Sequence, residues 1–487
     1  MKRLFTLLFV SLLFLTSCEK DLDINIDPNT PPQITKGLAL SAAQGSLVTV
    51  MGGELFNLGG MFAQFYTQSP SAGQYDEMDQ YNLNTDYANR FWTELYSGAL
   101  QDLHYVQEES LEDGDTGSYL IATVLKAYTF QYLVDIFGDI PYEEALKGIE
   151  NISPAPTSGE EVYQDLISSI NLAIENYEKD PVDNGVLKQD LIYGGDISKW
   201  IEFANTLKLR MYMRVSGTSM ASPDKVMELL NEGNFLTENA AFTAFSDATG
   251  KRHPYYEVQI EYLGNINTIA SNSLHEYLRI NEDPRLEIIY QPNAKDEFIG
   301  LDQGLGLSVE YGGYKATNFS RPDITPTTPV FLMTVAESKF LQAEALLRYA
   351  GGAGAEEKYE EGVLSSFALH GLSIEQAESL ISNGGAYQYE NGSSIEEKLE
   401  QIALQKWVSL ANANNLEAWI ETLRTGYPIL TESATPQYGE GRRIVSVASV
   451  LPGLQMPQSL FYPDEEVQRN RNLKQKSTLM EKVWWNQ

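Results

Sequence analysis

Residues 118–137, SYLIATVLKAYTFQYLVDIF, show the helical pattern that dominates this chain. The stretch carries two charges, Lys126 and Asp135, and its apolar residues would lie on nearly every side of a helix. A helix of this kind must be covered all round, so it belongs in the middle of a helical array. Gly138 follows directly and is typical of a helix end, and residues 139–142 leave as an extended turn. The sequence therefore predicts a mainly α-helical fold.

Amphipathic stretches on the C-terminal side of this helix come in pairs. Residues 157–177 begin with a capping box formed by Ser158 and Glu161, and they supply the first partner helix. Further helices are expected at 199–217, 222–233, 331–351, 355–371 and 395–424. Because no pair can bury its apolar face alone, we expect stacked hairpins like tetratricopeptide units, without a strict repeat period.

Three segments interrupt this helical pattern. The stretches near 62–96, 234–328 and 425–475 are irregular, and Gly, Asn, Asp and Tyr are frequent in them. Long structured excursions from a regular scaffold are where binding residues usually occur. We expect residues 36–487 to form one domain, with the helices as scaffold and the excursions as a loop-rich second face.

The first residues resemble a secretory signal. Lys2 and Arg3 precede an apolar run over residues 4–15, which is shorter than the roughly 20 residues that span a bilayer as a helix. Leu15-Thr16-Ser17-Cys18 then resembles a bacterial lipoprotein signal, and Cys18 is the one cysteine of the chain. The sequence predicts that residues 1–17 are removed and that Cys18 carries the lipid.

The segment 18–35 is polar and contains proline, as expected of a tether between lipid and domain. Its acidic residues Glu19, Asp21 and Asp23 resemble a surface-export signal, which favours exposure on the outer membrane. The net charge of −33 disfavours binding to nucleic acid or to anionic lipid, so attachment to the membrane is expected through the acyl chains.

Five segments carry a family resemblance in their order along the chain. They are AYTFQYLVDIFGDIPYEEA (127–145), YGGDISKWIEFANTLKLRMYMR (193–214), PVFLMTVAESKFLQAEA (329–345), IALQKWVSLANANNLEAWIETLRTGYP (402–428) and FYPDEEVQRNRN (461–472). Behind the lipoprotein signal, this series resembles the SusD/RagB family of outer-membrane nutrient-binding lipoproteins, and within it the second SusD-like subgroup.

The resemblance implies a fold and a function. The fold is a tetratricopeptide-like scaffold with a loop-rich second face. The function is capture of oligosaccharide or peptide by a lid on a SusC-like, TonB-dependent barrel, without an enzymatic step and without a cofactor. An alternative function keeps the same transporter partner. In it, the protein only seats or gates the barrel and does not contact ligand.

Aromatic residues in the excursions are the candidate ligand contacts. Flat tyrosine rings offer apolar faces to sugar C–H groups or peptide side chains, and neighbouring polar groups can bond hydroxyls or amides. The candidates are Tyr66, Tyr75, Tyr81, Tyr255, Tyr256, Tyr311 and Tyr314, with Arg285 and Asn318 as polar contacts.

The sequence contains only weak signs of a catalytic site or a metal site. Glu337 and Glu344 share one helix face and could suit an all-helical glycosidase, but Phe340 and Leu341 lie between them on a packing stripe. The four His are scattered, and the acidic loop 113–115 lacks the spacing of an EF-hand, so no metal site is predicted.

Other matched residues are expected to be structural. Tryptophans on amphipathic helices belong to the core, and arginines on the same helices pair with carboxylates of neighbouring helices. These residues are Trp200, Trp407, Trp419, Arg210, Arg214 and Arg424.

Overall fold

The apolar stretch quoted above forms α7 (Thr116–Phe137), and it is buried among other helices. It begins at Asp115, whose carboxylate accepts the backbone N–H of Ser118, and it ends at Gly138, which has φ of 82°. By length and composition α7 could cross a membrane, but 94% of its most hydrophobic window is buried inside the protein. α7 is therefore the core helix that the sequence predicts.

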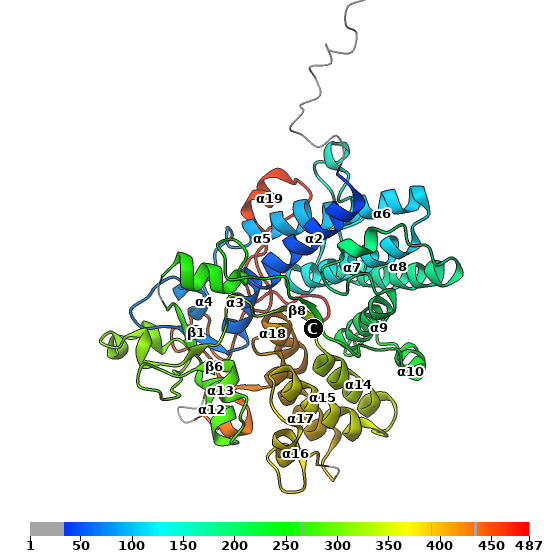
Figure 1. The fold of residues 1–487 in the computed structure, drawn as a ribbon. Helices are drawn as coiled ribbons and strands as arrows, with labels where there is room; N and C mark the ends of the chain where they lie inside the picture. Colours follow the sequence, from blue (N-terminus) through cyan, green and yellow to red (C-terminus); the bar gives the residue numbers. More distant parts are fainter. Residues whose placement is uncertain (1–33, 265, 391, 433–435, 487) are drawn as a thin grey trace, which may run out of the picture.

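The computed structural model describes residues 34–264, 266–390, 392–432 and 436–486 (Figure 1). The predicted signal peptide, Cys18 and nearly all of the tether lie outside the described residues. The longer helices are α2 (Lys36–Met51), α3 (Glu54–Phe62), α6 (Gln101–Asp113), α8 (Gly159–Lys179), α9 (Ile197–Arg214), α10 (Pro223–Glu232), α12 (Asn272–Ile280), α14 (Val335–Tyr349), α15 (Ala355–Leu369), α16 (Ile374–Ile381), α17 (Ile395–Leu410) and α18 (Asn415–Thr425). The shorter ones are α4 (Asp76–Asp79), α5 (Asn89–Thr93), α11 (Pro254–Tyr256), α13 (Leu286–Ile289) and α19 (Asp464–Arg469), with π-helical turns η1 (Glu94–Leu100) and η4 (Glu257–Tyr262).

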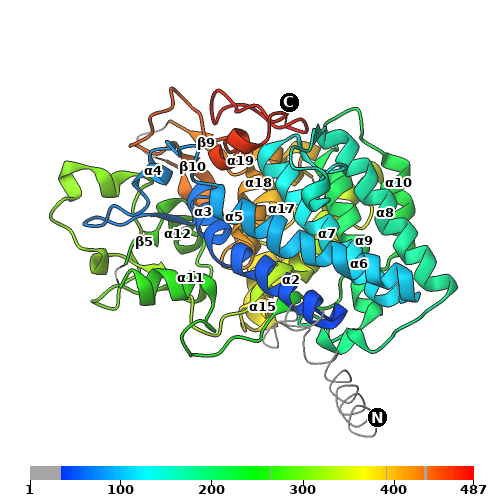
Figure 2. The same cartoon turned by 90° about the horizontal axis from the view of Figure 1, so that it is seen from above.

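The helices form one side of the molecule and the irregular segments the other. α6, α8 and α9 pack against α7, and α14 packs against α15 and α17. Seen from above, α8 and α10 lie at the side opposite to α4, α12 and β5 (Figure 2). This arrangement is the mainly α, tetratricopeptide-like scaffold with a loop-rich second face that the sequence predicts.

Short strands pair mostly within and between the irregular segments. Within the described residues they pair as five two-stranded sheets. The antiparallel pairs are β1 (Tyr66–Gln68) with β5 (Thr268–Ala270), β2 (Ile140–Pro141) with β3 (Pro156–Thr157), β4 (Ala240–Phe242) with β8 (Val330–Met333) and β6 (Tyr290–Gln291) with β7 (Arg321–Pro322); β9 (Ile429–Thr431) runs parallel to β10 (Arg442–Ile444).

Two helix boundaries differ from the prediction. The expected helix over 395–424 is two helices, because Asn412 takes φ of 59° and Asn414 caps α18 by accepting the N–H of Glu417. The first residues of 331–351 belong to β8, which bonds to β4, and α14 begins after its cap, Thr334. Helices α2, α3 and α6, near the N-terminus, are additional to those that the sequence predicts.

A buried ion network joins the helices through the predicted arginines. Arg214 of α9 bonds Asp135 of α7 at 3.1 Å and Glu417 of α18 at 2.7 Å, and all three side chains are fully buried. Arg424 bonds Glu344 at 2.6 Å. Such charges are tolerated in a core because each has an opposite partner. The structural role expected for the arginines is confirmed, and Trp200, Trp407 and Trp419 are likewise buried.

Candidate functional site

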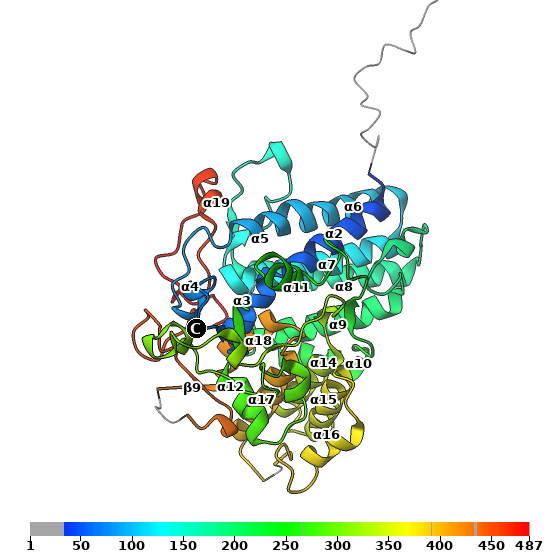
Figure 3. The ribbon, with the colours of Figure 1, turned by 60° about the vertical axis from the view of Figure 1, so that its left-hand side comes forward.

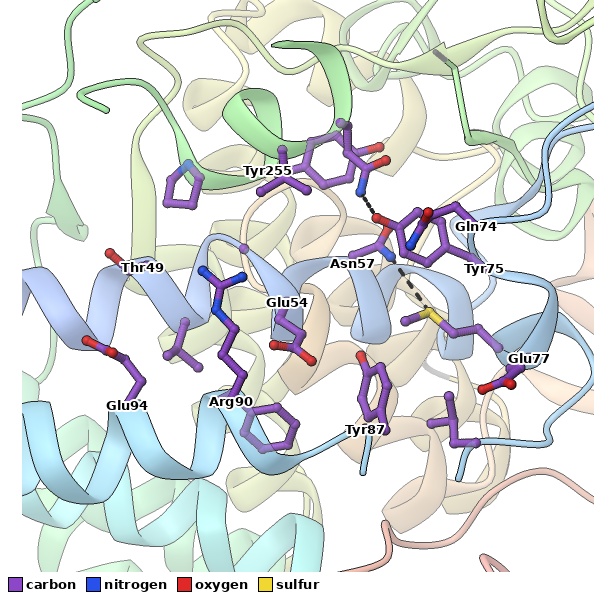
Figure 4. Close-up of a pocket in the computed structure, with 18 of the residues that line it drawn as sticks. Thr49, Glu54, Asn57, Gln74, Tyr75, Glu77, Tyr87, Arg90, Glu94 and Tyr255 are labelled. Carbon is purple, nitrogen blue, oxygen red and sulfur yellow. Dashed lines mark hydrogen bonds between the residues drawn. The ribbon is translucent and has the colours of Figure 1, made fainter. Parts of the chain in front are cut away.

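A pocket of about 590 Å³ opens on the irregular side of the molecule. It lies between α3, the segment leading into α4, the segment leading into α5, and α11 with η4 (Figure 4). α11 and α3 contact each other, and α11 lies in front of the scaffold helices in the view of Figure 3. The pocket is thus formed where the first two excursions meet the N-terminal helices.

The floor comes from α3. Glu54 and Asn57 are three residues apart, so both side chains lie on the helix face that lines the pocket. Gly53 precedes the helix, and a Cβ there would lie 2.6 Å from the carbonyl oxygen of Thr49 and 3.4 Å from Pro254. Glycine at this position allows the close approach of α2, α3 and α11 that shapes the floor.

Two tyrosines form the wall above the floor. The side-chain amide of Gln259 donates a hydrogen bond to the hydroxyl of Tyr75, and the backbone N–H of Tyr75 donates to Gln68 Oε1 of β1 at 2.8 Å. Tyr255 packs on Phe56 with ring centroids 5.3 Å apart, and its hydroxyl bonds that of Thr268. These bonds fix both rings in place before any ligand arrives.

Several buried polar atoms of the pocket lack a partner among the described residues. They are the Oδ1 atom of Asn57, the hydroxyl of Tyr87 and the Oε1 atom of Gln259. Asn57 and Gln259 are each 3% exposed, and the other end of the Asn57 amide faces Met78 Sδ at 3.6 Å. Because buried polar groups are normally hydrogen-bonded, these atoms are placed to bond something that enters the pocket.

The electrostatics of the floor centre on Glu54. Burial raises the pKa of its carboxyl to about 7, and the guanidinium of Arg90 opposes that rise. Burial, and then the neighbouring Glu54, raise the pKa of the Tyr87 hydroxyl well above its usual value. At neutral pH, therefore, Tyr87 is neutral and Glu54 exchanges readily between its two protonation states.

The structure brings two of the predicted contacts, Tyr75 and Tyr255, into this pocket. Tyr256, next in sequence, is half-buried against the core and is not among the residues that line it. Tyr311 and Tyr314 lie elsewhere, in a separate aromatic cluster whose ring centroids are 5.1 Å apart. Tyr314 is exposed there, and this cluster is a second candidate surface.

Asn318 belongs to the same turn as that second cluster. Its Oδ1 accepts the backbone N–H of Lys315 at 2.8 Å, so the side chain holds the turn that precedes Phe319. Phe319 packs on both tyrosines, with centroid distances of 6.4 Å to Tyr311 and 6.1 Å to Tyr314. Asn318 thus supports this surface from within its own loop.

Three predicted contacts are corrected to structural residues. Tyr66, Tyr81 and Arg285 are at most 1% exposed, so a ligand at the surface does not reach them. Tyr66 accepts a bond from Asn415 at 3.2 Å, and Arg285 forms an ion pair with Asp283 at 2.6 Å. Each is a polar group that its neighbours satisfy inside the core.

The pocket also contains residues that the sequence reasoning missed. Glu54, Asn57, Tyr87, Arg90 and Gln259 were not among the candidates. Tyr87, Arg90 and Gln259 do lie in the predicted excursions, but many other polar residues lie there too. Within the stretch GGELFNLGG (52–60), two polar side chains spaced as on one helix face are the signal that was available for the floor.

The two carboxylates that could suit a glycosidase are part of the buried ion network. Glu337 lies 3.4 Å from Arg210, and Glu344 is held by Arg424. Neither lines the pocket. In the acidic loop, Asp113 and Asp115 both bond the ammonium of Lys36, at 2.7 and 3.0 Å. Among the described residues, no group of three or more His, Cys, Asp and Glu side chains is placed to hold a metal.

Comparisons with known proteins give a consistent result. A family model described as starch-binding and associating with the outer membrane, SusD-like, matches residues 28–445. A SusD homologue from Bacteroides uniformis has a similar structure, with a TM-score of 0.77 and 24% identity over 92% of this chain and 99% of that one. A chitin-binding SusD homologue from Flavobacterium johnsoniae matches with a TM-score of 0.75 and 20% identity, covering 91% of this chain and 98% of that one. A search of curated proteins finds no match.

Proposed function

Because this chain belongs to the SusD-like family of starch-binding proteins that associate with the outer membrane, we propose that it captures oligosaccharide or peptide at the cell surface and delivers it to a SusC-like, TonB-dependent transporter. The chain is a binding protein rather than an enzyme, as its family is. Oligosaccharide is the favoured ligand, since the family is described as starch-binding and one protein of similar structure is a chitin-binding SusD homologue.

One observation carries the proposal, namely that the pocket combines fixed aromatic rings with unpartnered polar atoms. The ring of Tyr75 offers an apolar face to the C–H groups of a sugar ring, and Tyr255, which is 4% exposed, adds a small part of the wall. Asn57 and Gln259 then supply hydrogen bonds to hydroxyl or amide groups of the same ligand. Since these groups are already fixed, binding costs little ordering of the protein.

Delivery depends on the predicted lipid at Cys18. Confinement of the protein beside a membrane transporter raises the effective concentration of each for the other, so their contact need not be strong in solution. Ligand would be enclosed as the pocket-bearing side closes over the mouth of the barrel. A protein that only seats the barrel would form the same complex but would bind no ligand by itself.

A binding screen separates these roles. Lipid-free protein, residues 19–487, is tested against neutral glycans, charged glycans and a peptide digest, with intrinsic fluorescence and thermal shift as readouts. We expect a response to at least one class, reduced in the Tyr75→Ala variant. Absence of any response, both from the protein alone and from its complex with the transporter, would contradict capture and favour the seating role.

A further inference from the structure

The ionisable groups that line the pocket are mostly acidic. Glu54, Glu77 and Glu94 line it, against the single guanidinium of Arg90. Glu54 makes no hydrogen bond and no ion pair closer than 4 Å with any residue that the structure describes. A ligand carboxylate or phosphate would meet like charge here, whereas a cationic group would meet an unpaired carboxylate.

Further hydrogen-bond acceptors line the same pocket. Asn57 presents its unpartnered Oδ1 atom one turn along α3 from Glu54, and the hydroxyl of Tyr87 points toward that helix from the opposite side (Figure 4). The effect of Glu54 on the pKa of Tyr87 is a second sign that these two side chains lie close together. The pocket therefore offers two carboxylate oxygens of Glu54 with the hydroxyl of Tyr87 beside them, and the amide oxygen of Asn57 nearer to Tyr75 (Figure 4).

A primary ammonium has the complementary chemistry. It carries three N–H donors and no acceptor, so it needs three acceptors around it when it leaves water. A neutral hydroxyl brings a single donor and no charge, so it does not offset the charge of an ionised Glu54. Ammonium groups occur both in amino sugars with a free amine and in the lysine residues of peptides.

Resting on the function proposed above, we infer that this pocket selects ligands that carry a primary ammonium group, which binds at Glu54 beside Tyr87. Tyr75, with the small exposed part of Tyr255, then packs against the apolar part of the same ligand. The acidic floor determines which ligand group is preferred, and the aromatic wall contributes affinity for neutral and cationic ligands alike.

The preference is linked to pH. An ammonium favours the ionised form of Glu54, so its affinity rises as pH increases through about 7, where this carboxyl loses its proton and its pKa lies. The other ionisable groups that face the pocket are Arg90, Glu77, Glu94, Tyr75, Tyr87 and Tyr255. Burial raises the pKa of all three tyrosines, so they stay neutral over this range. A ligand without the amine has no positive charge to interact with ionised Glu54, so its affinity should not rise when Glu54 loses its proton.

Two matched pairs of probes test the inference on the mature protein in detergent. One pair is a glucosamine oligosaccharide and the fully N-acetylated form of the same length. The other is a terminally blocked lysine peptide and the same peptide with acetyl-lysine. Titration calorimetry at pH 7 should give at least about tenfold tighter binding of the free-amine form in one pair, the ratio expected for a charge-assisted hydrogen bond. The pair that responds identifies the source of the amine.

Variants assign the preference to the floor. Glu54→Gln should remove the preference for the amine, so that the Kd values of the free-amine and acetylated forms become equal within about twofold. The matched control Glu112→Gln removes one exposed carboxylate from α6, outside the pocket, and should keep the preference. Circular dichroism checks that both variants are folded.

Different results would contradict the ammonium inference and the capture function. Equal affinity for free and acetylated forms, or a preference that survives in Glu54→Gln, would overturn the ammonium inference. If the acetylated glycan still binds and Tyr75→Ala weakens it, the capture function stands without the amine selectivity. If an amine-free glycan binds and Tyr75→Ala does not affect it, the pocket itself is not the capture site. Loss of amine binding on raising the pH from 6 to 8, measured with the lysine peptide, would also contradict the inference.

Discussion

The side-chain amide of Gln259 donates a hydrogen bond to the hydroxyl of Tyr75, and this bond joins two excursions 184 residues apart in sequence. Both residues line the same pocket, so the bond fixes one wall of it. A wall fixed in this way presents an aromatic face without first having to order it, which favours binding. The pocket is thus a product of long-range contacts rather than of one motif.

Loss of the aromatic face should weaken binding. Tyr75→Ala removes a ring and its bond to Gln259, and we expect about a 10- to 100-fold rise in Kd for the ligand found in the screen, as for loss of an aromatic contact. Tyr262→Ala is the control, because Tyr262 is exposed and does not line the pocket. Titration calorimetry measures both, and equal Kd values for the two variants would count against the pocket.

Glu54 should make stability depend on pH. Its pKa is raised to about 7 in the folded protein, from an ordinary value of 4.5, so the folded state binds more protons between these limits. Its contribution to the free energy of unfolding is therefore fully present below about pH 4.5 and is lost as pH rises through 7. Glu54→Gln should equal the wild type near pH 4 and be more stable at pH 8, by on the order of 2 kcal/mol.

Urea unfolding at the two pH values measures this difference. Other buried carboxyls also have raised pKa values, among them Asp79 at about 6, so the stability of both proteins changes with pH for other reasons. The free energy of unfolding of the variant is therefore compared with that of the wild type at the same pH. A Glu54→Gln protein less stable than the wild type at pH 8 would show that the carboxylate is satisfied in the folded state.

The buried ion network should be needed for folding. Arg214→Met leaves Asp135 and Glu417 buried without their partner, and breaking such a network typically costs about 3–5 kcal/mol. Arg469→Met is the control, because its pair with Glu465 is exposed and should contribute less than about 1 kcal/mol. Thermal unfolding compares them, and similar melting temperatures would be the contrary result.

The scaffold was more predictable from the sequence than the pocket. Local signals in 118–137 and at the cap Ser158 are strong, because apolar periodicity and capping act over a few residues. By contrast, Asn57 and Gln259 become neighbours of Tyr75 only through packing of distant segments. Tyr66 and Tyr81 resemble Tyr75 in their sequence surroundings but are buried, since burial is decided by what covers a residue after folding.

The lipid anchor is tested by fractionation. Cys18→Ser removes the thiol that the predicted lipid would modify, so the protein should move from the membrane fraction to the soluble fraction, with the same ligand affinity. Metabolic labelling with a fatty-acid analogue should mark the wild type and not the variant. Continued membrane association and labelling of Cys18→Ser would contradict an anchor at this residue.

A crystal structure of the protein with the best ligand from the screen would show whether the pocket between α3 and α11 captures that ligand. Capture at this site predicts ligand density against Tyr75 and Tyr255, with a polar ligand atom within hydrogen-bond distance of Asn57 Oδ1. Ligand found only on Tyr311 and Tyr314, with the pocket unchanged, would contradict it.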